Sequence, residues 1–231
     1  MQNQSFATAF NEKNYTKVIG KALQHDKTTD FSHLRSLYIQ MIFYQPNSDS
    51  LMNELLTRSA RVQAAASKIQ DQDGAEDYQG KLKTYTEFVA MHVGHPDVMW
   101  MASILAKDDP ALGDPAIYAW IYDRLKRLVL GSGDGKTPES AYEIATWGEE
   151  NLIFGTLGVQ RLKTEAISAG FVRYNMHSVY NPETDSTSTL FVNSTYPQRF
   201  RDENASNESS PLDFSTFSDH SLKSIPQGEG E

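Results

Sequence analysis

A glycine-dense segment, residues 131–138 (GSGDGKTP), divides this chain into two parts with different patterns. Before it, apolar residues recur at helical spacing, whereas after it most apolar residues sit in short segments that favour strands. Glycines tolerate backbone angles that other residues avoid, so the segment is suited to turn the chain sharply between two elements. The sequence therefore predicts an α+β protein with a helical part followed by a strand-rich part.

The helical part covers residues 1–130. Short connections between its helices favour antiparallel neighbours. No 34-residue period recurs, so we expect an irregular helical bundle or partial solenoid rather than a repeat array. Apolar stripes predict helices at 6–10, 15–23, 34–42, 51–69, 82–92, 98–105 and 115–128, with Gly74 and Gly80 in a loop.

The second part, residues 131–200, predicts a small, mostly antiparallel β-α-β-β-β unit packed on the helices. Strands are expected at 141–145, 159–167, 171–180 and 189–192, a helix at 147–157, and a turn at Ala169 and Gly170. Residues 201–231 are rich in Ser, Asn, Glu and Pro, a composition typical of a disordered tail. We therefore divide the chain at 130 and 200.

Composition excludes several classes of function. The net charge is −9, and residues 201–231 carry two basic against seven acidic residues, so no basic field is available for nucleic acid. The chain has no cysteine, which excludes disulfides, thiolate nucleophiles and cysteine-ligated metals. No run of about 18 apolar residues occurs, so we expect no membrane insertion. The first residues lack a signal-peptide pattern, which leaves the cytoplasm, or export after removal of a signal, open. Oligomeric state is not determined by the sequence.

The ending Gly135-Lys136-Thr137 resembles a phosphate-binding loop. That loop needs a glycine at the position of Leu130, and it follows a strand, whereas a helix is predicted here. Pro138 also removes a backbone N–H near the place where phosphate oxygens would bind. We therefore interpret the segment as a turn and expect no nucleotide or other cofactor.

Two further groups carry possible chemistry. Glu149 and Glu150 are adjacent, an arrangement that could provide acid–base catalysis, but neighbours on a helix point about 100° apart. Near a helix start they also interact favourably with the helix dipole. His92, His95 and Asp97 form the one cluster of histidine and acidic residues in the sequence. These residues could bind a metal or take part in catalysis. In the alternative, they cap a loop and contribute partly buried imidazole rings. We expect no metal site.

The signature SGDGKTPESAY at 132–142, then Glu149 and Glu150, then Leu157 and Gly158, is similar to an uncharacterised bacterial family known as domain of unknown function 4919. The resemblance spans roughly residues 30–195. It implies a helical part coupled to this signature, in a bacterial and often exported protein. It implies no activity.

Two hypotheses of function follow. In the first, the protein is a non-catalytic interaction or structural module that binds a peptide or protein partner. Its candidate anchors are any exposed members of the set Tyr38, Tyr44, Trp100, Tyr118, Trp120 and Tyr122.

In the alternative, the protein is an acid–base hydrolase with a site where the two parts meet. The candidate catalytic residues are Asp134, Lys136, Glu149, Glu150, His92 and His95. The absence of any convergent catalytic motif in the sequence favours the interaction module.

Overall fold

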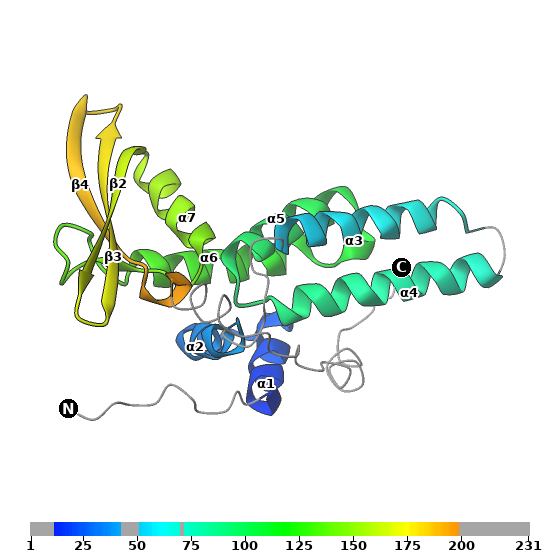
Figure 1. The fold of residues 1–231 in the computed structure, drawn as a ribbon. Coiled ribbons are helices and arrows are strands. Elements are labelled where there is room, and N and C mark those ends of the chain that lie inside the picture. The colour runs from blue at the N-terminus through cyan, green and yellow to red at the C-terminus, as the bar shows by residue number, and fades with distance from the viewer. Residues whose placement is uncertain (1–11, 43–50, 70–71, 199–231) are drawn as a thin grey trace.

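The computed structural model describes residues 12–42, 51–69 and 72–198 of the chain. The helices of the first part pack mainly as antiparallel hairpins, with α3 along α4 and α5 along α6, while α1 and α2 lie against α6 (Figure 1). In chain order they are α1 (Glu12–Leu23), α2 (Phe31–Ile42), α3 (Leu51–Ala66), α4 (Gln72–Met91), α5 (Pro96–Asp108), the short 3-10 helix η2 (Pro110–Leu112) and α6 (Pro115–Leu130).

Local signals place the ends of these helices. Asp114 caps α6 through its carboxylate, which accepts a hydrogen bond from the Ala116 amide at 2.8 Å, and Pro115 occupies the first turn. At the other end the Gly131 amide closes α6 on the Arg127 carbonyl. The core of this half is built on fully buried tyrosines and aliphatic side chains, among them Tyr15, Tyr38, Leu34, Met99 and Ile121.

The second part is a β-α-β-β-β unit that packs on the end of the helical half (Figure 1). Its four strands lie in the order β1-β4-β3-β2; β1 is parallel to β4 and the other pairs are antiparallel. Side chains from α7 and from the end of α6 cover one face of this sheet. The elements are β1 (Tyr142–Glu143), α7 (Trp147–Leu157), β2 (Gln160–Ala169), β3 (Val172–Asn181) and β4 (Ser186–Asn193). The predicted α+β class and the order of elements are confirmed.

Two predicted details are wrong. Gly74 and Gly80 lie inside α4 rather than in a loop. A glycine in a helix costs about 1 kcal/mol relative to alanine, and here the apolar side chains of Tyr78 and Leu82 pack against the core and hold the helix. The helix expected to reach residue 69 ends at Ala66. The expected helix at 6–10 and the expected disordered tail at 201–231 lie outside the described residues.

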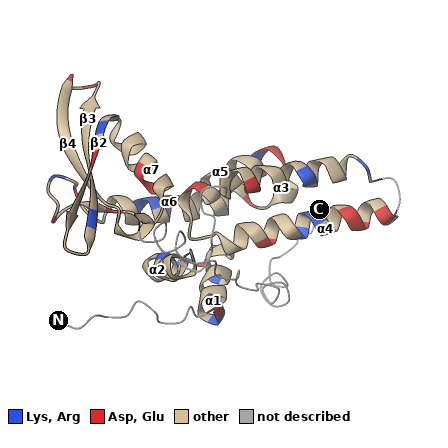
Figure 2. Cartoon of the chain, in the orientation of Figure 1, with Lys and Arg blue, Asp and Glu red and all other residues tan. Residues whose placement is uncertain are grey.

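Charged residues of both signs occur along the helical half (Figure 2). On α4, for example, Lys81 pairs with Asp77 and Lys83 pairs with Glu87, each one helical turn apart on the surface. Within the described ranges, no helix is both long enough and apolar enough to span a membrane.

Candidate functional site

The segment with Asp134 and Lys136 forms a self-contained turn. The amides of Asp134 and Gly135 donate to the Ser140 carbonyl at 2.9 and 2.8 Å. The Lys136 amide donates to the Asp134 carboxylate at 3.0 Å, and the Thr137 amide donates to the Ser140 hydroxyl at 3.2 Å. The backbone amides of residues 134–137, which a phosphate would need as donors, are therefore already used within the protein.

Asp134 serves this turn through its side chain. The Ser140 hydroxyl donates to its carboxylate at 2.6 Å, and this bond, with the Lys136 amide, lowers the pKa of Asp134 to about 2. Lys136 is exposed and its ammonium lies 3.3 Å from the same carboxylate. Both candidate residues thus point to solvent at a turn and line no described pocket.

Glu149 joins the two halves of the molecule. Its side chain is 1% exposed and forms an ion pair of 2.8 Å with Arg35 of α2, which is 114 residues away in the sequence. The Ala145 amide also donates to it at 2.6 Å, just before the first turn of α7. Arg35 further donates to the Glu143 carbonyl at 3.1 Å, so one guanidinium ties α2 to both β1 and α7.

Glu150 belongs to a second hydrogen-bond network, which lies between α7 and the sheet. Its carboxylate contacts the ring nitrogen Nε2 of His177 at 2.9 Å, the amide of Asn175 at 2.8 Å and the guanidinium of Arg161 at 3.1 Å. Burial alone would raise the pKa of Glu150, but the hydrogen bonds from His177 and Asn175 and the charge of Arg161 outweigh it, so the pKa is lowered. His177 is fully buried and its other ring nitrogen meets the Thr164 hydroxyl at 2.9 Å. The two glutamates therefore do not serve one reacting atom.

His92 lies in the helical core, where its ring meets the Tyr38 hydroxyl at 3.2 Å. Burial lowers the pKa of His92 to about 3, and the neighbouring His95 and Arg58 add to this effect. The ring is therefore neutral at physiological pH and faces Tyr38 and Phe88 rather than a cavity.

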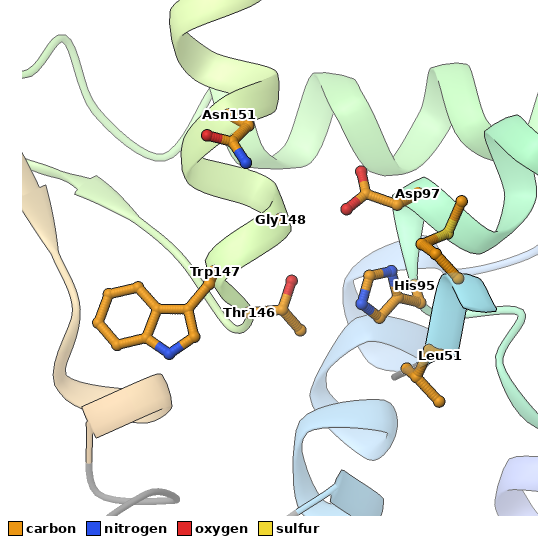
Figure 3. Close-up of a pocket in the computed structure, with 8 residues that line it drawn as sticks. Leu51, His95, Asp97, Thr146, Trp147, Gly148 and Asn151 are labelled. Carbon is orange, nitrogen blue, oxygen red and sulfur yellow. The ribbon is translucent and has the colours of Figure 1, made fainter. Parts of the chain in front are cut away.

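His95 and Asp97, from the histidine and acid cluster noted in the sequence, line a pocket in the described part of the chain. This pocket, of about 300 Å³, lies at the junction of the two halves, where α3, α5 and α7 begin (Figure 3). We call it the junction pocket. Its lining residues are Leu51 and Met52 from α3, His95 and Asp97 from the start of α5, and Thr146, Trp147, Gly148 and Asn151 from the start of α7.

Two buried polar atoms of residues that line the junction pocket have no hydrogen-bond partner among the described residues. These atoms are Nδ1 of His95 and the hydroxyl oxygen of Thr146. The two residues are only 5% and 6% exposed, respectively. Figure 3 shows the His95 ring, the Thr146 side chain and the Asp97 carboxylate around one space. Buried polar groups are nearly always hydrogen-bonded, so two such atoms without a partner in neighbouring residues of one pocket are unusual.

Burial disfavours the charged forms of the two titratable residues in the pocket, Asp97 and His95. Burial raises the pKa of Asp97 and the nearby Glu149 charge adds to this effect, while His95 opposes it. Burial lowers the pKa of His95, although Asp97 and Glu149 act in the opposite direction. Among the described residues Asp97 forms no ion pair, whereas the charge of Glu149 is matched by Arg35.

Gly148 makes the position of Asp97 possible. A side-chain carbon at residue 148 would collide with the Asp97 carboxylate, so only glycine allows this carboxylate to lie against the first turn of α7. The described residues contain no group of three or more histidine, aspartate or glutamate side chains arranged to hold a metal ion.

The sequence indicated His92, His95 and Asp97 as one cluster, of which the pocket contains His95 and Asp97, but it gave no sign that Thr146, Gly148 and Asn151 join them. A threonine directly before a predicted helix is the usual sign of an N-cap. Here the Thr146 hydroxyl makes no capping bond, which only the structure reveals.

The expected aromatic anchors are mostly packed. Tyr38 and Tyr118 are buried, Trp120 and Tyr122 are partly buried against the core, and Tyr44 lies outside the described residues. Trp100, on α5, is 45% exposed.

Comparisons with protein-family models, with curated proteins and with solved structures found no match to this chain. The resemblance to domain of unknown function 4919 stays a prediction.

Proposed function

We propose that this protein is a non-catalytic interaction module that binds a peptide or protein partner, and that the junction pocket receives a cationic group of that partner, an ammonium or a guanidinium. One observation carries the proposal. Asp97, a half-buried carboxylate that forms no ion pair with any described residue, shares a pocket with His95 and Thr146, each of which has a buried polar atom without a hydrogen-bond partner in the described part of the chain.

The charge of the pocket favours a cation. Asp97 is partly removed from water and repelled by Glu149, and both effects make a positive neighbour favourable. The starts of three helices would by themselves attract an anion. Acidic residues in their own first turns, Glu54 on α3, Asp97 on α5 and the glutamates of α7, already offset that tendency.

The unpartnered atoms also suit a donor-rich ligand. The lowered pKa keeps His95 neutral, and in the tautomer with its proton on Nε2 the Nδ1 atom accepts a hydrogen bond. The Thr146 hydroxyl accepts as well. An ammonium offers three donors and a guanidinium five, enough for His95, Thr146 and Asp97 together. Leu51 and Met52 supply apolar surface for the aliphatic stem of a lysine or arginine side chain.

The hydrolase alternative is supported by one feature of the same pocket. Asp97 and His95 have pKa values displaced in opposite directions from their ordinary values, upward for the acid and downward for the base. Such pairs occur in acid–base catalysis. The candidates Asp134, Lys136, Glu149 and Glu150 do not line the pocket, so a hydrolase would depend on His95 and Asp97.

Calorimetric titration separates the two functions. We expect N-acetyl-arginine amide or N-acetyl-lysine amide to bind, and the uncharged citrulline analogue to bind at least tenfold more weakly. Asp97→Asn should abolish binding of the cation, whereas Asp108→Asn, at the exposed end of the same helix, should leave binding unchanged. Equal binding of citrulline, or full binding by the Asp97→Asn protein, would contradict the proposal. Turnover of an ester or amide library that Asp97→Asn removes would favour the hydrolase.

A further inference from the structure

Strand β2 forms an open edge of the sheet. It stands last in the strand order, and each of its ten residues is exposed. Large apolar side chains are exposed along it and at its end, with Leu162 59% and Phe171 81% accessible. A long open edge presents unpaired backbone donors and acceptors to any other strand, and proteins usually cover or shorten such an edge.

The register with β3 assigns the two faces of β2. A bulge at Leu162 separates Arg161 from the regular run that begins at Lys163. Thr164 reaches His177 and so lies on the face covered by α7. Because side chains alternate, Lys163 and Glu165 lie on the opposite, uncovered face, where their charged groups are 2.6 Å apart.

We propose that two copies of this chain pair through their β2 edges, antiparallel, about a two-fold axis at Thr164, to form one continuous sheet. The inference does not depend on the function proposed for the junction pocket. We choose a second copy of this chain as the partner because, in this register, the charged residues Lys163 and Glu165 of one copy lie opposite residues of opposite charge in the other copy.

Geometry limits the possible registers. Residues directly opposite in an antiparallel pair share a face, so a two-fold axis normal to the sheet must pass through a residue position. An axis at Lys163 places lysine opposite lysine, and an axis at Glu165 places glutamate opposite glutamate. An axis at Thr164 places Lys163 of each copy opposite Glu165 of the other, which gives two cross-strand ion pairs.

Lysines and bulges on an edge strand also serve to prevent pairing. Two facts argue against that role here. Lys163 is already neutralised by Glu165 of its own strand, so the edge carries a balanced pair rather than a lone charge. The bulge lies near the start of β2 and leaves residues 163–169 in regular register.

Charge reversal tests the register on the full-length chain. Analytical ultracentrifugation should show a reversible dimer. Lys163→Glu alone and Glu165→Lys alone should each weaken the dimer about tenfold or more, because like charges then face each other. An equimolar mixture of the two single variants, or the double variant carrying both changes, should restore it. A wild-type protein that stays monomeric at all accessible concentrations would overturn the proposal, as would single variants that dimerise like the wild type.

Crosslinking gives a second test that depends on position alone. The chain has no cysteine, so Thr164→Cys introduces a single thiol at the proposed axis. Opposite residues approach to the Cα separation that a disulfide needs, so oxidation should crosslink this variant into a dimer. Ser168→Cys, on the same strand but away from the axis, should remain uncrosslinked. Efficient crosslinking through residue 168 with none through residue 164 would place the interface elsewhere.

Discussion

The adjacent residues Glu149 and Glu150 each have a buried carboxylate, and different partners stabilise the two carboxylates. Glu149 meets Arg35 from the helical half, while Glu150 meets His177 and Arg161 from the sheet. Taking a carboxylate out of water is costly, so each depends on its partners. The pair recognised in the sequence as a possible acid–base site thus has structural contacts on both sides of α7.

This dependence predicts the effect of removing Arg35. Arg35→Leu leaves the Glu149 charge buried without its ion pair, and we expect a loss of about 3 kcal/mol in the free energy of unfolding. The matched control is Arg127→Leu, which breaks an exposed ion pair with Asp123 and should cost less than about 1 kcal/mol. Urea denaturation measures both. Equal losses in the two variants would show that Arg35 is not a structural clamp between the halves.

At the scale of elements, the turn at residues 131–138 connects the end of α6 to the sheet and fixes the direction of the chain between them. Gly135 has a φ of 68°, and its carbonyl accepts a hydrogen bond from the Phe191 amide of β4 at 2.8 Å. The turn therefore extends the hydrogen bonding of the sheet as well as reversing the chain.

Alanine at Gly135 tests this role. A side-chain carbon there would lie 2.6 Å from Leu190 and would add to the strain of the positive φ. Gly170, in the turn between β2 and β3, has a φ of 62° but open space around it. Gly170→Ala therefore measures the strain alone, and Gly135→Ala should cost about 1 kcal/mol more, measured by thermal or urea unfolding. An equal cost would mean that close packing at residue 135 contributes nothing.

Most elements could be predicted because their signals are local. The helix at 147–157 and the turn at Gly170 follow from apolar spacing and from glycine, and the structure has both. The glycines of α4 misled the prediction because contacts with the core, which the sequence does not display, hold that helix together. The candidate site could be predicted only in part. His95 and Asp97 are neighbours in sequence, but Thr146 joins them only through tertiary packing.

At the scale of the whole molecule, the junction pocket is where the helical half meets the β-α-β-β-β unit. Its polar groups come from the starts of α5 and α7, and Arg35 with Glu149 fixes α7 against α2 close by. Gly148 adds a second constraint, since the Asp97 carboxylate fits only where residue 148 has no side chain. The shape of the pocket therefore depends on how the two halves dock.

The ionisation of Asp97 links this pocket to pH. Because its pKa is raised, the carboxylate takes up a proton at a higher pH than an ordinary aspartate, and a cationic ligand should lose affinity as the pH falls through that value. Burial lowers the pKa of His95, so this ring takes up a proton at a lower pH than an ordinary histidine does.

The most direct test is the titration of the Asp97 carboxyl carbon by NMR, with and without saturating N-acetyl-arginine amide. A guanidinium bound at Asp97 stabilises the ionised form, so the account predicts a raised pKa in the free protein and a clearly lower pKa in the complex. If the ligand binds and the Asp97 midpoint does not move, the cation is bound elsewhere and the junction pocket is not the recognition site.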